Sequence, residues 1–515
     1  MRKLLFFTIV LFFSSIITPN YSQPLYNQDW GTLIPIYNRT VKPFSSLKTI
    51  VRTYFFVAEV NPKTGCLYLV NAYGDEIFEY CPDQPIPKLI YKIPNNEEGF
   101  STIESIKFDS DNYLVISGRT ANSQLATSGA YSENLIFGES SRPTFISKID
   151  LEGNLMWSTY FHDLVVNASH LTIDANNNIY ILNKRNKNTV ATSSSFQEIG
   201  DLNASLDYQD VISKLDSNGK HIWSTFYTKD SSKIRSIVAG TDGLYIYGEH
   251  LGAEATSNYF GTSNSFQESI SDGKSSLKTL SKVFLSKFSF EGKRIWSTYF
   301  GLQNTNVIYG NTLKNNHSLT VIDNEPYILT SHKKYPFKNQ NITTEKAYLR
   351  EPFESESLTT ISKFSSKGER VWTSYINAGE YIFSDGKDLF ISSSPANGNS
   401  EKNLPITENA HQPKHGGGRS DVYISILSSN GTTLEYASFY GYEGQDSGVT
   451  LPTQNGFYII GSSNLNQKVK APFVTTNNPK DKYFKVGEDN YSGDFLSYFK
   501  VKKLKDKKTK KKRRR

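Results

Sequence analysis

The stretch FISKIDLEGNLMWSTYF at residues 145–161 recurs along the chain with small changes. Its relatives are VISKLDSNGKHIWSTFY from 211, FLSKFSFEGKRIWSTYF from 284 and TISKFSSKGERVWTSYI from 360. In each copy, β-branched and aromatic residues alternate with small polar ones on both sides of a glycine, which is the period-two pattern of strands. The recurring segment is therefore predicted to be a β-hairpin with a Gly turn.

The full repeat is longer than one hairpin. The turn glycines are Gly153, Gly219, Gly292, Gly368 and Gly431, spaced 66, 73, 76 and 63 residues apart. Each unit contains two further strands, one like SIKFDSD or HLTIDANN and one like NYLVISGRT, LYIYGEHL or FYIIGSSN. The second of these occurs seven times, as does the strand that ends the unit. Radial units of four antiparallel strands are typical of β-propellers.

The two ends of the repeat region predict how the ring closes. A lone strand, DWGTLI from 29, precedes the first unit, and SGDFLSYFKV at 492–501 is a third strand with no fourth after it. We predict an all-β fold, a single seven-bladed β-propeller of four-stranded antiparallel blades, closed by the N-terminal strand completing the last blade.

All five tryptophans stand at one position of the unit's last strand; they are Trp30, Trp157, Trp223, Trp296 and Trp372. The KLIYKI run from 88 and Tyr436 fill that position in the other two units. A tryptophan stripe can form a sugar or cofactor platform, but one position filled once per repeat favours a core role.

The N-terminus has the pattern of a secretory signal peptide. Arg2 and Lys3 precede a mostly apolar stretch, residues 4–17, which is shorter than the roughly 20 residues that span a bilayer. We predict a signal peptide at 1–22, the propeller at 23–501 and a basic, disordered tail at 502–515. The protein is expected to be secreted, and to be extracellular, at the cell surface or periplasmic, with no transmembrane span.

The net positive charge of the chain comes mainly from the tail. Residues 502–515 hold eleven positive groups and one negative group, whereas residues 23–501 hold 44 positive and 49 negative groups. This mildly acidic body excludes a basic nucleic-acid-binding surface, and the tail lacks the aromatic residues that stack on bases. The tail is either solvated or docks on an anionic surface such as phosphorylated glycolipid or anionic polysaccharide, by attraction that salt weakens.

The two cysteines, Cys66 and Cys81, flank a predicted hairpin. Two β-rich runs, CLYLVNA and DEIFEYC, surround Tyr73-Gly74 as a two-residue turn. This register places Cys66 directly opposite Cys81, so export to an oxidising compartment predicts a cross-strand disulfide. Two buried thiols are the alternative.

The last unit carries the clearest resemblance to a known family. DVYISILSSNGTTLEYASFYGYEGQDSG at 421–448, followed by NGFYIIGSS, resembles the bacterial SBBP-type β-propeller repeat. The loops before the third strand also match, as TSSSFQ at 192, TSNSFQ at 262 and TENAHQ at 407. The resemblance covers roughly residues 100–500. It implies an exported or surface-exposed bacterial propeller and carries no common catalytic chemistry.

A second resemblance concerns the Asp-Gly-Trp pattern of Asp216, Gly219 and Trp223. It is similar to the tryptophan-docking motif of eight-bladed quinoprotein dehydrogenases, but the spacing here is one residue short and the unit count is seven. We interpret the pattern as a way of locking a hairpin between blades and predict no cofactor.

Catalytic and metal-binding motifs are scarce. His415–Gly418 could form an oxyanion hole, but no G-x-S-x-G nucleophile elbow accompanies it, so it is interpreted as a loop. The eight histidines are scattered, and the Asp-rich FDSDN and DANNN segments lack EF-hand spacing and suit tight turns. We predict no metal site and no catalytic residues.

Loop irregularity is the remaining functional signal. Strand order places the loops carrying SFQ and those leaving WSTYF on one face, and the longest are residues 251–282 and 301–318. Loops on a rigid scaffold commonly bind ligands, so this face and the mouth of the central channel form the candidate site, although drift in tolerant loops would look the same. The predicted binding residues are Phe196, Gln197, Phe266, Gln267, His411 and Gln412.

We therefore expect a secreted or cell-surface, non-enzymatic binding or assembly module that uses this face. We expect a monomer whose partner is an unidentified protein or glycan. An enzyme acting on extracellular polysaccharide, with carboxylates at the channel mouth, is the alternative, as is a purely structural envelope component. Because propellers carry unrelated activities, this expectation rests on the loop-bearing face and not on the fold.

Overall fold

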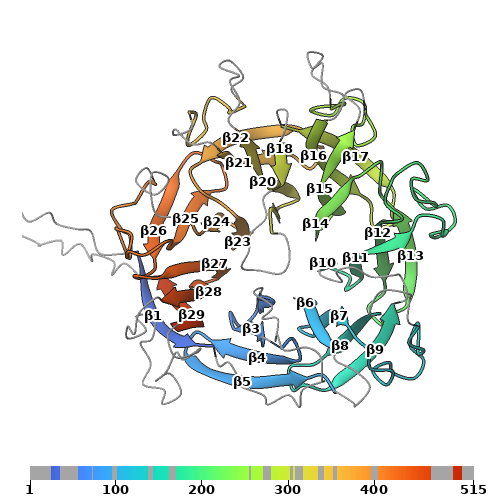
Figure 1. Ribbon diagram of the computed structural model, residues 1–515, viewed down its shortest axis with the longest axis horizontal. Coiled ribbons are helices and arrows are strands. Elements are labelled where there is room, and N and C mark those ends of the chain that lie inside the picture. Colours follow the sequence, from blue (N-terminus) through green and yellow to red (C-terminus); the bar gives the residue numbers. More distant parts are fainter. Residues whose placement is uncertain are drawn as a thin grey trace, which may run out of the picture.

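In the computed structural model of the 515-residue chain, seven sheets radiate around a common centre (Figure 1). The described residues are 25–34, 56–71, 73–94, 101–136, 143–161, 170–253, 257–270, 280–301, 305–307, 317–333, 342–351, 357–395, 404–465 and 491–501. These residues form strands and no helix, so they include no helix that could cross a bilayer. The signal peptide and the basic tail predicted from the sequence lie outside them.

The blades follow one another along the chain. Blade 1 contains β2 (Ala58–Val60), β3 (Leu67–Val70), β4 (Glu76–Cys81) and β5 (Gln84–Lys92). Blade 2 contains β6 (Thr102–Phe108), β7 (Leu114–Arg119), β8 (Thr144–Ile149) and β9 (Leu155–Phe161). Blade 3 contains β10 (His170–Ile173), β11 (Ile179–Asn186), β12 (Tyr208–Leu215) and β13 (His221–Phe226). Blade 4 contains β14 (Lys233–Ala239), β15 (Leu244–Ala253), β16 (Leu280–Phe288) and β17 (Arg294–Phe300).

The remaining three blades include one irregular blade and the closing blade. Blade 5 contains β18 (Thr305–Val307), β19 (Leu319–Ile322), β20 (Glu325–Lys333), β21 (Ser357–Phe364) and β22 (Arg370–Ile376). Blade 6 contains β23 (Tyr381–Ser384), β24 (Asp388–Ser393), β25 (Val422–Ser428) and β26 (Leu434–Tyr440). Blade 7 contains β27 (Gln445–Thr453), β28 (Gly456–Leu465), β29 (Tyr491–Val501) and, as its outer strand, β1 (Tyr26–Leu33).

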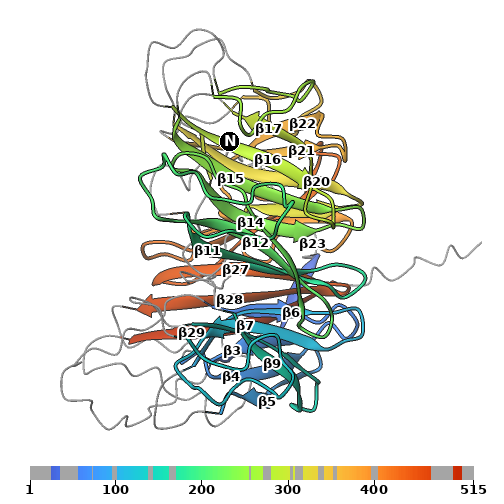
Figure 2. The same ribbon diagram turned by 90° about the vertical axis from the view of Figure 1, so that its right-hand side faces the viewer.

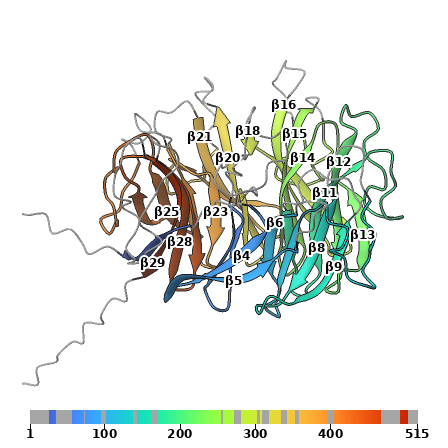
Figure 3. The same ribbon diagram turned by 60° about the horizontal axis from the view of Figure 1, so that its bottom comes forward.

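The seven-bladed fold and its closure are confirmed. β1 pairs antiparallel with β29, from Tyr26 opposite Val501 to Leu33 opposite Phe495. The first and last strands of the chain therefore share one sheet. Viewed from the side, the blades stand next to one another and their strands cross the thickness of the ring (Figure 2 and Figure 3).

The hydrophobic core is divided among the interfaces between neighbouring blades. One buried cluster joins blades 1 and 2, and corresponding clusters follow around the ring to the interface of blades 7 and 1. Each sheet thus buries both faces, which explains why many strands are apolar on both sides rather than strictly alternating.

The tryptophans belong to this core, as predicted. Each indole Nε1 donates to a carbonyl in the 3–4 hairpin turn of the next blade: Trp30 to Pro82, Trp157 to Ser217, Trp223 to Phe290, Trp296 to Ser366 and Trp372 to Ser429. The turn glycine then lies against the ring. A Cβ on Gly368, which has φ +86°, would lie 2.7 Å from the Trp296 ring, so this position requires glycine for its φ and for its close approach.

The hairpin of blade 1 has the predicted register. Leu67 lies opposite Tyr80 and Val70 opposite Ile77, and Cys66 and Cys81 form a disulfide with a Cα–Cα distance of 4.2 Å. The DANNN segment forms the predicted tight turn. The Asp174 side chain accepts the backbone N–H groups of Asn176 and Asn178.

Candidate functional site

The SFQ loops carry the binding residues that the sequence predicted, and these loops lie along the outer strands. Thr192 N–H donates to the Ser224 carbonyl at 3.1 Å, and the Gln197 carbonyl accepts the Phe226 N–H at 2.9 Å. The same main-chain pattern links Thr262 and Gln267 to β17, and Thr407 and Gln412 to β26. The loop therefore covers the free edge of the outer strand, a known way to prevent edge-to-edge association.

The aromatic residues of these loops touch the following blade. The Arg294 guanidinium lies 4.8 Å from the Phe196 ring centroid, and that of Arg370 lies 4.7 Å from the Phe266 ring. The His411 ring packs edge-on against Phe499. Phe196, Phe266 and His411 thus connect neighbouring blades, although Phe266 is still 42% exposed.

The glutamine side chains are engaged within the fold. Gln197 Oε1 accepts the Tyr259 hydroxyl, Gln267 Nε2 donates to the Ser269 carbonyl, and Gln412 Nε2 donates to Asp421. The six residues therefore have structural contacts, and a ligand-binding role for them stays a prediction. The long loops at 251–282 and 301–318 lie only partly within the described residues.

A second candidate site lies at the centre of the ring, where side chains of three blades meet. Phe56, Val57, Ala58 and Glu59 of blade 1, Ile106 and Lys107 of blade 2, and His317 before β19 line a small hollow there. The innermost position of blade 5 is split between β18 and β19, which both pair with β20. Residue 317 lies two residues before β19, the second of these segments.

His317 is held from the opposite side by blade 6. Its carbonyl accepts the Ile382 N–H at 2.8 Å, and its ring centroid lies 4.6 Å from that of Phe383. Burial and the nearby Lys107 and His170 hold the pKa of His317 well below its ordinary value. The imidazole is therefore neutral at pH 7, with one nitrogen able to donate and the other able to accept a hydrogen bond.

The charged residues around the centre form ion pairs. Lys107 Nζ lies 2.5 Å from Glu59 Oε2, joining blades 2 and 1. Toward the loop-bearing face, three further pairs lie within blades: Arg119 with Glu104, Lys184 with Asp210, and Arg235 with Glu249. The described channel region thus presents balanced, fixed charges.

His170 of β10 makes the ring centre sensitive to acid. Burial lowers its pKa to about 4, against the smaller raising effects of the Asp210 charge and of a hydrogen bond with the Arg235 backbone. Because the folded state binds this proton less well than the unfolded state, stability present above pH 6.5 is lost as the pH falls toward 4. The expected loss is roughly 3 kcal/mol.

We expect His170→Asn to remove that part of the pH dependence when urea unfolding is measured at pH 7 and pH 4.5. An unchanged difference in stability between the two pH values would contradict the lowered pKa of His170.

A second buried polar group lies between blades 6 and 7, beside the glycine-rich loop. Asp446 and Asp421 are both fully buried, and Asp421 Oδ2 accepts the Gly416 N–H at 2.6 Å. Asp446 Oδ2 accepts the Tyr442 N–H at 2.6 Å. The residues His415–Gly418 form a loop, as predicted.

Burial raises the pKa of Asp446 to about 6. The pKa shift of Asp446 is opposite in direction to that of His170, because the folded state binds the Asp446 proton more tightly than the unfolded state does. Stability is therefore lost as the pH rises from about 4 to 6, by roughly 3 kcal/mol. We expect Asp446→Asn to be more stable than wild type at pH 7 and to lose this advantage at pH 4, as measured by urea unfolding. Equal differences at both pH values would show that Asp446 does not titrate in this range.

Sequence reasoning missed the central residues because they come from separate blades. Glu59, Lys107, His170 and His317 each lie in or beside an inner strand whose pattern indicates only a strand. Nothing in their local spacing indicates that closure of the ring brings them together.

Comparison with solved structures finds distant structural similarity to other proteins. No family model and no curated protein matches the sequence. Among solved structures, BamB from Moraxella catarrhalis is 10% identical with a TM-score of 0.37, covering 93% of this chain and 99% of that chain. The polysaccharide lyase Uly1 is 8% identical with a TM-score of 0.42, covering 94% and 100%. Virginiamycin B lyase from Staphylococcus aureus is 12% identical with a TM-score of 0.39, covering 88% and 96%. The assignment of the fold rests on the strand pairing, and these values assign no function.

Proposed function

We propose that the protein is a secreted or cell-surface, non-enzymatic binding module of the SBBP-repeat type that receives its ligand at the centre of the ring. One observation carries the proposal: a neutral imidazole, an ion pair and aromatic rings converge there from blades 1, 2, 5 and 6. Such groups recognise hydroxyl- and amide-rich ligands, so an unidentified glycan or protein segment is the expected partner.

The charge arrangement favours binding over catalysis. A general acid or base works best when its pKa lies near the working pH. The pKa of His317 is held well below its ordinary value, and the Glu59 carboxylate is engaged by Lys107 Nζ. The fixed pair can orient a ligand without taking part in a reaction.

A binding screen with a turnover assay tests the proposal. Residues 23–515 are applied to immobilised glycans and extracellular polysaccharides, and both retention and chain cleavage are measured. We expect retention without cleavage, and at least tenfold weaker binding for the double variant Lys107→Met, His317→Ala. Lys387→Met is the matched control, because Lys387 is an exposed lysine on a blade 6 turn. Equal binding by the double variant and wild type would refute a central site.

The basic tail is tested in the same screen. A chain ending at Val501 is compared with the full chain at low and high salt. Binding lost by both truncation and salt would assign attachment to the tail, by charge attraction. Binding kept by the shorter chain supports recognition by the propeller.

The same screen tests the enzymatic alternative. Cleavage of a polysaccharide by residues 23–515 would show that the protein is an enzyme and would refute the non-enzymatic proposal.

A further inference from the structure

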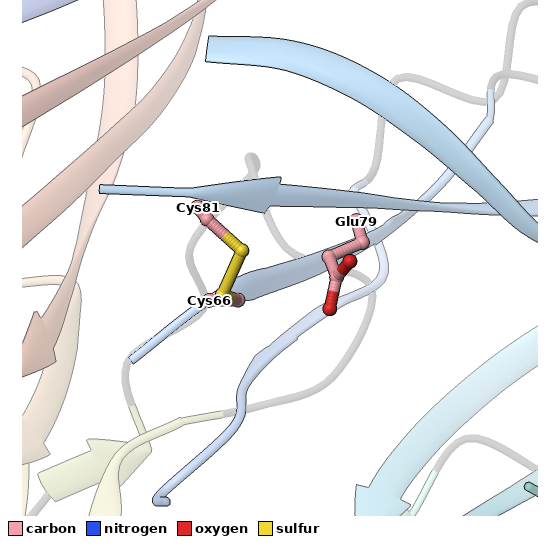
Figure 4. Close-up of side chains that lie close together, drawn as sticks. All are labelled: Cys66, Glu79 and Cys81. Carbon is pink, nitrogen blue, oxygen red and sulfur yellow. A yellow bond between two sulfur atoms is a disulfide. The ribbon is translucent and has the colours of Figure 1, made fainter. Parts of the chain in front are cut away.

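Four chemically reactive or polar side chains share one face of the β3–β4 hairpin in blade 1. The antiparallel register places Tyr68 opposite Glu79, and two pairs further along, on the same face, Cys66 is joined to Cys81. Figure 4 shows the Glu79 carboxylate beside the disulfide. Glu59 of β2 lies opposite Tyr68 on the same face, nearer the ring centre, but the proposed function uses none of these four side chains.

The spacing suits a single metal ion. One carboxylate oxygen of Glu79 and the two sulfur atoms all lie within 4.8 Å of one another. Zn²⁺ binds thiolate sulfur at about 2.3 Å and carboxylate oxygen at about 2.0–2.2 Å, so one ion between the three atoms can reach all of them after small side-chain rotations. A fourth tetrahedral position is left for water.

Tyr68 supplies the support that such sites commonly have. Its hydroxyl donates a hydrogen bond to Glu79 Oε1, and Tyr68 itself is fully buried. A hydrogen bond of this kind fixes the orientation of a ligating carboxylate. Cys66 is buried while Cys81 and Glu79 are partly exposed, so both a reductant and an ion can reach the site from solvent.

We propose that Cys66, Glu79 and Cys81 form a redox-gated site for a thiophilic divalent cation such as Zn²⁺. Two equivalents of a thiol, or a phosphine with one water, supply two electrons and two protons that convert the S–S bond to two thiols; the reductant becomes its disulfide or its phosphine oxide. The binding cation displaces the two thiol protons to solvent. Exchange with an oxidised disulfide re-forms the S–S bond and releases the cation, while that disulfide takes up two protons from solvent and becomes two thiols.

The bound cation replaces the covalent link across the hairpin. Pro82, next to Cys81, accepts the Trp30 indole N–H at 2.8 Å, so the hairpin end that the disulfide holds is also where blade 7 docks on blade 1. We therefore expect the cation to stabilise the reduced protein and to leave the oxidised protein unaffected.

Cobalt titration of the full chain in phosphine reductant tests this site. We expect one Co²⁺ per chain, with a thiolate-to-metal charge-transfer band that is missing from the oxidised protein and from the Cys66→Ser, Cys81→Ser double variant. Glu79→Gln and Tyr68→Phe should each weaken Co²⁺ binding by about 10- to 100-fold. Glu435→Gln, an exposed carboxylate on β26, is the control and should bind as wild type does.

Thermal unfolding is a second test, which remains valid if reduction of the disulfide destabilises blade 1. Zn²⁺ should raise the unfolding temperature of the reduced wild type and leave that of the oxidised protein unchanged. The proposal is overturned if the reduced wild type shows no charge-transfer band, if Glu79→Gln binds Co²⁺ as tightly as wild type, or if Zn²⁺ fails to stabilise the reduced chain.

Discussion

Trp296→Ala is expected to lower the free energy of unfolding by about 3–5 kcal/mol, the usual cost of deleting a large buried aromatic side chain. Trp296 is 7% exposed, donates to the Ser366 carbonyl of blade 5 and packs on Gly368. Its removal leaves a cavity between two blades and takes one hydrogen bond from the Ser366 carbonyl, which also accepts from Lys287 Nζ. Urea unfolding followed by tyrosine and tryptophan fluorescence measures the effect.

The neighbouring residue provides a matched control. Ile295 precedes Trp296 on β17 and points to solvent, with 52% of its surface exposed. Ile295→Ala is expected to change stability by less than about 0.5 kcal/mol. If both variants lose stability equally, the tryptophan does not lock the blades.

Removal of β1 is expected to have a still larger effect. A chain that begins at residue 35 lacks the outer strand of blade 7, including Trp30, whose burial alone is worth about 3–5 kcal/mol. The main-chain groups of β29 that bond to β1 would also become a free edge, which favours association with other chains. We expect a much lower unfolding temperature and oligomers in size-exclusion chromatography.

Two comparisons make the β1 deletion interpretable. Removal of residues 502–515 should leave the unfolding temperature unchanged, so shortening the chain is not by itself the cause. A synthetic peptide of residues 25–34 should restore the monomer if β29 is left intact. A stable monomer that lacks β1 would show that the ring does not depend on this closure.

Much of the architecture could be predicted because it repeats. Four strands per unit, the Trp position and the lone N-terminal strand are local patterns that each unit shows again, so the ring and its closure follow. The same holds for Cys66 and Cys81, since one turn at Gly74 determines every cross-strand pair of that hairpin.

The candidate site could not be predicted in the same way. Residue 59 and residue 317 are far apart in sequence and meet only because the ring closes, and no periodicity records that contact. The repetition of the SFQ motif has a structural role that the sequence analysis did not predict: Thr192 and Gln197 use main-chain hydrogen bonds to cover β13. The even spacing of Thr and Gln in these loops was the available signal for that role.

Hydrogen–deuterium exchange with and without a ligand from the glycan and polysaccharide screen tests the location of binding most directly. A central site predicts slower exchange at residues 56–59, 104–107 and 317–319, with the SFQ loops and residues 502–515 unchanged. Protection confined to the loops at 192–197 and 262–267 or to the tail, with no change at the ring centre, would contradict the proposed site.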